Sequence, residues 1–372
     1  MEQQTRVLVT GAQGFIGKNL IVHLNERAGT EVLTFTRGDN EEKLITLVSQ
    51  ADAVVHLAGE NRPTDVTDFA RVNTDLTRTL CEAINMTGMP IPLILASSIQ
   101  ADCDNPYGQS KRAAEQVVEA FTGETGNPTV IYRLPGVFGK WCKPNYNSVV
   151  ATFCHNIARD LPIKINDVAA TLPLVYVDDV VEEVLRVLDD AKPGLVWGEV
   201  TPNYAISLGE LAEQIRAFQN CRTNLISERV GTGLTRALYS TYISYLPTER
   251  FTYDLPQHGD ERGVFVEMLK TPDSGQFSFF TIHPGVTRGS HYHHSKTEKF
   301  LVVKGVAIMR FRQKITGETY EVTVSGNKPQ IVDTIPGWVH DITNIGDNEA
   351  MVMLWANEVF DRQRPDCIPC EV

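Results

Sequence analysis

Tyr107 and Lys111 stand four residues apart in the segment Tyr-Gly-Gln-Ser-Lys, and together these residue types can move a proton. On a helix, this spacing places both side chains on one face. A free phenol, with a pKa of about 10, exchanges protons poorly at neutral pH, but a neighbouring ammonium and a positively charged nicotinamide lower that pKa. Ser97 and Ser98 end an apolar run shortly before this segment, and their hydroxyls can polarise a carbonyl. This combination predicts a centre that reduces a carbonyl group.

A second set of residues has the composition of a metal site. His291 and His293 are two residues apart, so on a strand they point to the same side, while Tyr292 points away. With Glu298 and His340 they offer three imidazoles and one carboxylate, which suit Zn²⁺ or another divalent metal. Isolated core histidines are the alternative interpretation. For a bound metal, both a catalytic and a purely structural role stay open.

A glycine-rich loop follows the first apolar run and opens a helical pattern. Its sequence is Thr-Gly-Ala-Gln-Gly-Phe-Ile-Gly over residues 10–17. Gly11 permits a tight turn, Gly14 a close approach of a pyrophosphate to the backbone, and Gly17 close packing of helix on strand. The helix N-terminus then offers free N–H groups to phosphates. We therefore predict a dinucleotide site that includes Phe15 and Ile16; a tight turn without ligand is the alternative.

Arg37 ends the second strand-like run, where an NAD enzyme usually carries Asp or Glu for the ribose 2′-hydroxyl. An arginine suits the 2′-phosphate of NADP instead. The sequence thus predicts NADPH, with a solvated surface arginine as the alternative.

The elements that must position these residues follow two patterns. Up to about residue 140, short apolar runs alternate with amphipathic helical stretches, which predicts right-handed crossovers and a parallel sheet covered on both faces. The expected strands are 6–10, 31–36, 53–57, 92–96 and 129–133, and the expected helices are 15–26, 69–85 and 107–121.

From residue 251 onward, short strand-like runs are separated by Gly, Pro or Asn, which indicates an all-β sandwich or barrel. The expected runs are 263–268, 276–283, 298–303, 307–312, 318–322, 330–334 and 350–356. With a helical segment around 225–246 and a boundary near Pro247, we predict an α/β Rossmann domain over 1–246 and a β domain over 247–372.

Composition narrows the class of protein. The 372 residues carry a net charge of −12, which argues against binding to nucleic acid or to an anionic membrane. Seven scattered cysteines favour a reducing compartment, and the Cys367-x2-Cys370 pair lacks partners for a zinc knuckle. We see no signal peptide and no apolar run long enough for a membrane helix, so the expected location is cytoplasmic.

The GxxGxxG spacing, Leu57-Ala58-Gly59, Asn73, the Tyr107–Lys111 pair and Val177-Asp178-Asp179-Val180 together resemble the extended short-chain dehydrogenase/reductase family. The resemblance covers about residues 5–245 and implies a Rossmann fold with NAD(P) and, often, a nucleotide-sugar substrate.

That resemblance assigns Ser98, Tyr107 and Lys111 to catalysis. It assigns Leu57, Ala58, Gly59 and Pro135 to the cofactor site, with Lys111 bonding the nicotinamide ribose. Lys140, Lys143 and Asn147 are candidates for contact with a substrate diphosphate, or ordinary loop residues. The family's usual third strand is missing, which puts the adenine contact in doubt.

In the β domain, Gly285-x5-His291-x-His293-x4-Glu298-x6-Gly305 matches the first cupin motif, and Pro336-Gly337-x2-His340-x3-Asn344 resembles the second. The domain resembles the sugar-nucleotide epimerase branch of cupins, and this resemblance implies a jelly-roll fold.

A reductase fused to a metal cupin resembles the bifunctional UDP-2-acetamido-2,6-dideoxy-hexos-4-ulose reductases of the CapF type, which act in capsule or O-antigen synthesis. That resemblance implies 3-epimerisation of a UDP-4-keto sugar by the cupin. NADPH-dependent reduction of carbon 4 then gives UDP-N-acetyl-6-deoxy-L-talosamine, on the route to UDP-N-acetyl-L-fucosamine. A homodimer is expected from the family. A dTDP-4-keto-sugar reductase with an accessory cupin and a non-catalytic NADP sensor stay open as alternatives.

Overall fold

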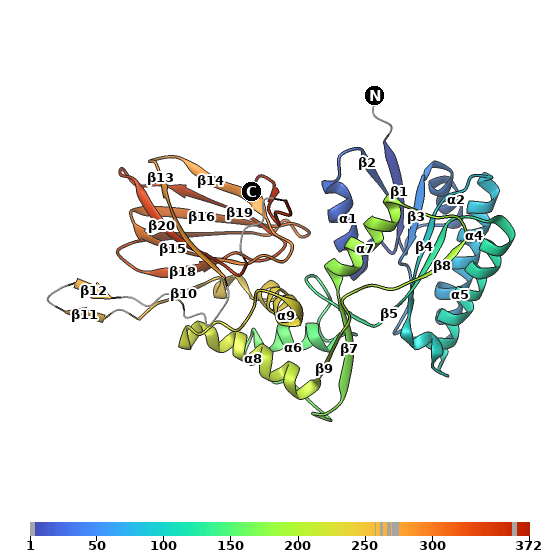
Figure 1. Ribbon diagram of the computed structural model, residues 1–372, viewed down its shortest axis with the longest axis horizontal. Helices are drawn as coiled ribbons and strands as arrows, with labels where there is room; N and C mark the ends of the chain where they lie inside the picture. Colours follow the sequence, from blue (N-terminus) through green and yellow to red (C-terminus); the bar gives the residue numbers. More distant parts are fainter. Residues whose placement is uncertain (1–3, 257, 261–262, 266–268, 270–274, 359–362) are drawn as a thin grey trace. The chain divides into compact units, whose positions relative to one another are not determined.

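The computed structural model describes residues 4–256, 258–260, 263–265, 269, 275–358 and 363–372. The chain forms two compact units (Figure 1). The first comprises Met1–Lys143 with Leu172–Ala205, and the second comprises Pro144–Thr171 with Ile206–Val372.

The first unit is built on a parallel sheet of six strands in the order β2-β1-β3-β4-β5-β8. These strands are β1 Thr5–Thr10, β2 Thr30–Phe35, β3 Ala53–His56, β4 Leu93–Ser98, β5 Thr129–Leu134 and β8 Leu195–Gly198. The helices are α1 Phe15–Glu26, α2 Glu41–Gln50, α3 Thr67–Phe69, the π-helix Ala70–Asp75, α4 Leu76–Thr87, α5 Pro106–Thr125 and α7 Val177–Asp189. The predicted Rossmann pattern is confirmed.

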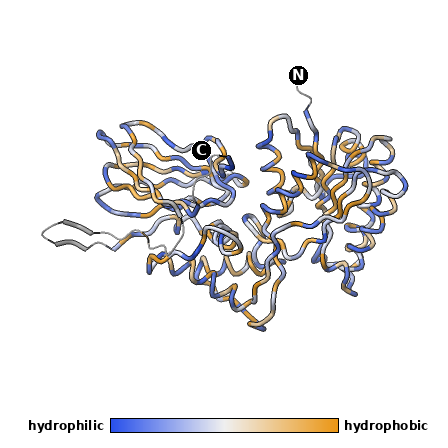
Figure 2. The backbone as a smooth tube through the Cα atoms, in the orientation of Figure 1, coloured by the Kyte–Doolittle hydropathy of each residue, from blue (hydrophilic) through white to orange (hydrophobic). Residues whose placement is uncertain are grey.

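Alternate residues of each strand pack into two separate cores, one on each face of the sheet. On one face, Leu8, Val54 and Leu93 pack with residues of α2, α4 and α5. On the other face, Val9 and Val55 pack with residues of α1 and α7. Figure 2 shows this apolar character along the strands.

The missing third strand is confirmed, because β2 is the edge of this sheet in the described part of the chain. The connection from β2 to β3 is the helix α2, whose N-cap Asn40 accepts a hydrogen bond from the Lys43 N–H. The helix expected over 69–85 is instead interrupted by the π-helix Ala70–Asp75. A π turn inserts an extra residue into the helical ladder and is frequent at functional sites. Here it carries Asn73.

The second unit contains two antiparallel five-stranded sheets, in the orders β10-β18-β15-β20-β13 and β17-β16-β19-β14-β21. Together they form the predicted jelly roll of a cupin domain. The strands are β10 Thr252–Asp254, β13 Gln276–Ile282, β14 Thr287–Tyr292, β15 Glu298–Lys304, β16 Val306–Gln313, β17 Thr319–Ser325, β18 Gln330–Asp333, β19 Trp338–Asn344, β20 Ala350–Ala356 and β21 Ile368–Pro369. A separate two-stranded antiparallel sheet pairs β11 His258–Asp260 with β12 Gly263–Phe265. Of the strand expected over 263–268, residues 266–268 lie outside the described residues.

Among the described residues, three α-helices belong to the second unit: α6 Val149–Ile157, α8 Leu208–Asn224 and α9 Gly233–Ser244. The helix expected around 225–246 corresponds to α9, whereas α8 was not expected, although Ser207 and Glu210 form a capping box at its start. These helices precede the expected boundary at 246/247, yet they pack in the same unit as the sandwich. One reason is a buried ion-pair network in which Asp333 contacts Arg222 of α8 and Lys299 of β15, both at 2.6 Å.

Three short strands, β6 Gly136–Phe138, β7 Thr171–Tyr176 and β9 Tyr204–Ser207, form a further small sheet. No helix of the described residues has the length and apolar composition that crossing a bilayer requires.

Candidate active site and metal centre

The glycine loop has the close contacts that its sequence predicts. Gly11 has φ +68°, and a Cβ there would lie 2.7 Å from the Ala58 nitrogen, so only glycine fits. A Cβ on Gly17 would overlap the Gly11 carbonyl oxygen. Gly14 is the N-cap of α1 and no side chain caps this helix end, which leaves its first N–H groups for a ligand.

His56 ties this loop to the next one. The Thr77 hydroxyl donates to the Asn73 carbonyl at 2.7 Å and therefore accepts from Nε2–H of His56 at 2.9 Å. Nδ1 of His56 is then the acceptor for the Thr10 hydroxyl at 2.7 Å, and Thr10 Oγ1 in turn accepts from the Ala58 N–H at 3.2 Å. Burial lowers the pKa of His56 to about 3, so the ring is neutral. This chain holds the Gly11 turn against the Leu57–Gly59 loop.

Asn73 fixes the other end of the same loop. Its side-chain oxygen accepts from the Glu60 N–H at 2.7 Å, and its amide nitrogen donates to the Glu60 carbonyl at 3.0 Å and to the Ser110 hydroxyl at 2.9 Å. Since Ser110 is on α5 next to Lys111, the π-helix couples the cofactor loop to the helix that carries the reducing pair.

Ser98, Tyr107 and Lys111 are brought together. The Ser98 side chain lies close enough to that of Tyr107 to lower its pKa. Lys111 donates to the Ala96 carbonyl at 2.7 Å, and its Nζ lies 3.8 Å from where a Cβ of Gly59 would stand. Ser97 points elsewhere, because its hydroxyl donates to the buried Glu115. Of the two serines, Ser98 is therefore the one beside Tyr107, and its catalytic role stays a prediction.

The electrostatics of this centre differ from the sequence-based expectation in one respect. Burial raises the pKa of Tyr107, and the neighbouring Ser98 side chain opposes this only in part. The protein's own groups therefore do not lower the phenol pKa as expected. Burial also lowers the pKa of Lys111 to about 8, against the charge of Glu115, which raises it.

Arg37 is available to a ligand. Its side chain is 82% exposed, and its guanidinium forms an ion pair with Glu60, whose side chain is only 9% exposed. The Glu60 carboxylate also accepts from the N–H groups of Asn61 and Arg62, at 3.1 and 3.2 Å. Glu60 is thus fixed by its own loop, and it holds Arg37 from one side.

The expectation for Lys140 is wrong. Its side chain is buried and its ammonium pairs with Asp178 at 2.6 Å, so a diphosphate cannot reach it without breaking a buried ion pair. Lys143 and Asn147 are exposed, and Pro135 is half-buried in the turn between β5 and β6.

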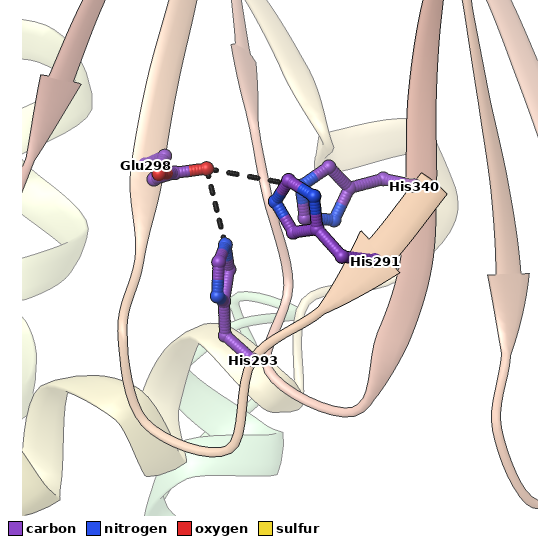
Figure 3. A group of neighbouring side chains, drawn as sticks. All are labelled: His291, His293, Glu298 and His340. Atoms are coloured by element: carbon purple, nitrogen blue, oxygen red, sulfur yellow. Dashed lines mark hydrogen bonds and ion pairs between the residues drawn. The ribbon is translucent and has the colours of Figure 1, made fainter. Parts of the chain in front are cut away.

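The four expected metal ligands form one cluster (Figure 3). Their ligand atoms all lie within 4.8 Å of one another. His291 lies near the end of β14 and His293 just after it, while Glu298 begins β15 and His340 is on β19. Glu298 Oε2 lies 3.1 Å from His293 Nε2 and 3.7 Å from His340 Nε2. The register of β14 and β19 shifts between Gly289 and His291, where both Gly289 and Ser290 have positive φ.

The donor set fits a divalent metal. Nε2 of His340 is buried without a hydrogen-bond partner among the described residues, as expected for an atom reserved for a metal. Burial, together with the neighbouring His340 and His293, lowers the pKa of His291 to about 4, so this ring is neutral and able to ligate. Burial alone would raise the pKa of Glu298, but His293, His340 and Lys296 hold it well below its ordinary value. A carboxylate beside imidazoles suits Zn²⁺.

A cavity of about 210 Å³ opens beside this cluster. Its wall is largely apolar, and its polar groups are three of the candidate ligands, His291, Glu298 and His340, together with Arg288 and Asp341. The apolar residues of the wall are Phe280, Phe300, Met309, Ile342 and Leu354. An apolar pocket with a few convergent polar groups is the usual form of a small-molecule site.

Comparison with known proteins places this arrangement in a family. Residues 7–197 match the model of the NAD dependent epimerase/dehydratase family, and residues 258–368 match the polysaccharide biosynthesis C-terminal domain. A Pseudomonas aeruginosa protein named UDP-2-acetamido-2,6-beta-L-arabino-hexul-4-ose reductase is 58% identical over 367 residues, which cover 99% of each chain. The chain belongs to this reductase family.

Solved structures agree with the membership in this reductase family. The capsular polysaccharide assembling protein CapF from Staphylococcus aureus has 41% identity and a TM-score of 0.67, covering 98% of this chain and all of that one. A structure described as MoeE5 in complex with UDP-glucose and NAD has 21% identity and a TM-score of 0.55, covering 64% of this chain and 98% of its own. At that identity the second match shows the shared fold alone.

Some residues that build the two centres were not predicted from the sequence. His56, Glu115 and Asp366 contact predicted site residues or their neighbours, and Asp366 carries the carbonyl that accepts from Nδ1 of His293. Only the position of His56 at the end of a predicted strand, where parallel sheets place functional side chains, was a signal available in the sequence.

Proposed function

We propose that this protein is a bifunctional enzyme of nucleotide-sugar metabolism. It first epimerises a UDP-4-keto-6-deoxy-HexNAc at carbon 3 and then reduces carbon 4 with NADPH, giving UDP-N-acetyl-6-deoxy-L-talosamine. The observation that carries the proposal is the presence of two separately built centres, one in each compact unit. The name of the Pseudomonas relative supports the class of substrate.

In the reductive step, the Ser98 and Tyr107 hydroxyls bind the carbon-4 carbonyl oxygen, and Tyr107 gives it a proton. The nicotinamide supplies the hydride when it is bound. Since burial raises the Tyr107 pKa, the phenol keeps its proton at neutral pH and is ready to donate. Lys111, held by the Ala96 carbonyl, stands beside the cofactor ribose and stabilises the phenolate left behind.

For the cofactor, the pyrophosphate lies on the Gly11–Gly17 turn and the N-terminus of α1. Arg37 binds the 2′-phosphate of NADPH with the guanidinium face that Glu60 leaves open.

In Arg37→Glu a carboxylate repels that phosphate, so the ratio of kcat/KM for NADPH over NADH falls at least tenfold. Lys43→Glu on α2 is the matched control, because it makes the same charge change at a lysine that is 50% exposed and paired with Asp39. An unchanged ratio in Arg37→Glu would mean that Arg37 is a bystander.

In the epimerisation step, the cavity beside the metal ligands holds the sugar and keeps bulk water out. His291, His293, Glu298 and His340 would hold Zn²⁺ or another divalent metal, which would supply positive charge to a carbonyl oxygen there and so acidify the neighbouring C–H. We further propose that the enzyme works as a cytoplasmic homodimer in capsule or O-antigen polysaccharide synthesis. The relative described as a capsular polysaccharide assembling protein supports that setting.

Mass spectrometry of the products from UDP-4-keto-6-deoxy-HexNAc, with and without NADPH, tests the proposal. We expect a product two mass units heavier only with NADPH, and incorporation of solvent deuterium in both cases. Turnover of the corresponding dTDP-4-keto sugar at an equal or greater rate would favour the dTDP-sugar alternative. Absence of any turnover would favour a sensor, although the intact Ser98, Tyr107 and Lys111 speak against that outcome.

A further inference from the structure

The last described segment of the chain lies along the first two metal ligands. Strand β21 pairs with β14, with Pro369 opposite His291 and Ile368 opposite Tyr292. One residue further, the Cys370 N–H donates to the Ser290 carbonyl at 2.9 Å. The segment thus holds the strongly bent stretch in which Gly289 and Ser290 both have positive φ, directly before His291.

Asp366 anchors the other side of this stretch. One carboxylate oxygen accepts from the His294 N–H at 2.8 Å, and the other accepts from the N–H groups of Ser295 and Lys296, both at 2.7 Å. The Ser295 hydroxyl adds a fourth bond at 3.2 Å. The loop that leads from His293 to Glu298 is therefore gathered around a single carboxylate.

The main chain of the same residue contacts a ligand directly. The Asp366 carbonyl accepts a hydrogen bond from Nδ1 of His293. That bond places a ring proton on Nδ1, so in a neutral ring Nε2, which lies 3.1 Å from Glu298 Oε2, would offer its lone pair to a metal. Partners of this kind orient metal-bound histidines, and their loss typically weakens metal binding about 10–100-fold.

We propose that Asp366 is a positioning residue of the metal centre. Its carboxylate shapes the 293–298 loop and thereby presents its own carbonyl to His293. The inference rests on the proposed metal site, and it assigns a role in metal affinity to a residue that touches neither the metal nor the substrate. The C-terminal segment then belongs to the epimerisation centre.

Asp366→Asn in the full-length protein tests this inference. An asparagine turns one acceptor oxygen into an N–H donor, so at least one of the three backbone N–H groups loses its partner. We expect the Zn²⁺ dissociation constant, measured by competition with a chromophoric chelator, to rise at least tenfold. The visible spectrum of the Co²⁺-substituted protein should change as well. Asp347→Asn is the control, since Asp347 is exposed in the turn between β19 and β20 and should leave both readouts at wild-type values.

The possible results separate the inference from the proposed function. Metal affinity and Co²⁺ spectrum equal to wild type in Asp366→Asn would overturn the positioning role alone. If the wild-type protein binds no metal, the proposed metal centre fails and the inference with it. The melting temperature of each metal-free variant shows whether that variant folds. Asp366→Glu, which keeps the charge, is the second variant. If neither metal-free variant folds, the residue serves the whole barrel and the inference is wrong.

Discussion

Tyr107 has surroundings that favour the protonated phenol. Burial raises its pKa, and the neighbouring Ser98 side chain opposes this only in part. In Tyr107→Phe the ring remains but the proton donor is lost, so we expect NADPH oxidation with substrate to slow about 10²–10⁴-fold. NADPH affinity, measured by fluorescence titration, should stay within about threefold. Tyr320→Phe in β17 is the control for loss of a hydroxyl; a near-wild-type rate in Tyr107→Phe would refute the assignment.

The lowered pKa of Lys111 predicts how the rate of reduction depends on pH. Burial lowers its pKa to about 8, so the ammonium predominates below that pH and the neutral amine above it. Because the charged form stabilises the phenolate, kcat/KM should fall as the pH rises through about 8, since this parameter reports the free enzyme. In Lys111→Arg the guanidinium keeps its proton, so the fall should move to higher pH whatever the height of the plateau. A fall at the same pH in both proteins would assign it to another group.

At the residue scale, the sequence pointed to groups that could do chemistry but not to the residues that hold them. The Tyr107–Lys111 pair and the histidine cluster have local spacings that constrain their geometry. In contrast, His56 meets Thr10 across 46 residues of sequence, and Asp366 meets Ser295 across 71. No local pattern encodes contacts of that range, and the burial of Lys140 likewise depends on a distant partner, Asp178.

Among the elements, the link between helix α8 and the sandwich depends on Asp333. Its carboxylate and the Lys299 ammonium are each only 2% exposed, and Arg222 is 13% exposed. Asp333→Asn would leave two buried cations without their counter-charge, which typically costs about 3–5 kcal/mol. We expect a lower free energy of unfolding for the second unit in a urea titration followed by tryptophan fluorescence.

Asp254→Asn is the matched control for that measurement. Asp254 belongs to the same sheet, but its ion pair with Lys328 is 3.7 Å long and both side chains are 65% exposed. Exposed pairs contribute about 0–1 kcal/mol, so this variant should unfold close to wild type. If Asp333→Asn behaved like Asp254→Asn, the buried network would not fasten α8 to the sandwich.

The elements themselves were predicted unevenly. The Rossmann strands are short, fully buried apolar runs, and α1 was predicted with its observed bounds. Strands β14 and β19 were not among the expected runs, although they carry ligands. The sequence of β14, Thr-Arg-Gly-Ser-His-Tyr, is polar, and its bulge breaks the alternation that predicts a strand. Strand β19 begins directly after the turn Pro336-Gly337, where its His-Asp pair interrupts the alternation.

On the scale of the whole molecule, the two centres lie in different compact units. Ser98, Tyr107 and Lys111 belong to the first unit, and the four candidate metal ligands belong to the second. Each centre has its own support: the π-helix and the His56 chain for the reducing pair, and Asp366 for the histidine cluster. We therefore propose that the two reactions of the proposed function are chemically separable, since proton transfer by Tyr107 needs no metal.

Exchange of solvent deuterium into the UDP-4-keto sugar in the absence of NADPH, followed by NMR at carbon 3, tests that claim most directly. We predict exchange in the wild type and in Tyr107→Phe, and none in His291→Ala. The His291→Ala protein should still bind NADPH and reduce a ketone that already has the right configuration. Exchange at carbon 3 in His291→Ala would contradict a role of the metal centre in epimerisation. Loss of both activities, together with a lower melting temperature, would indicate that the metal has a structural role.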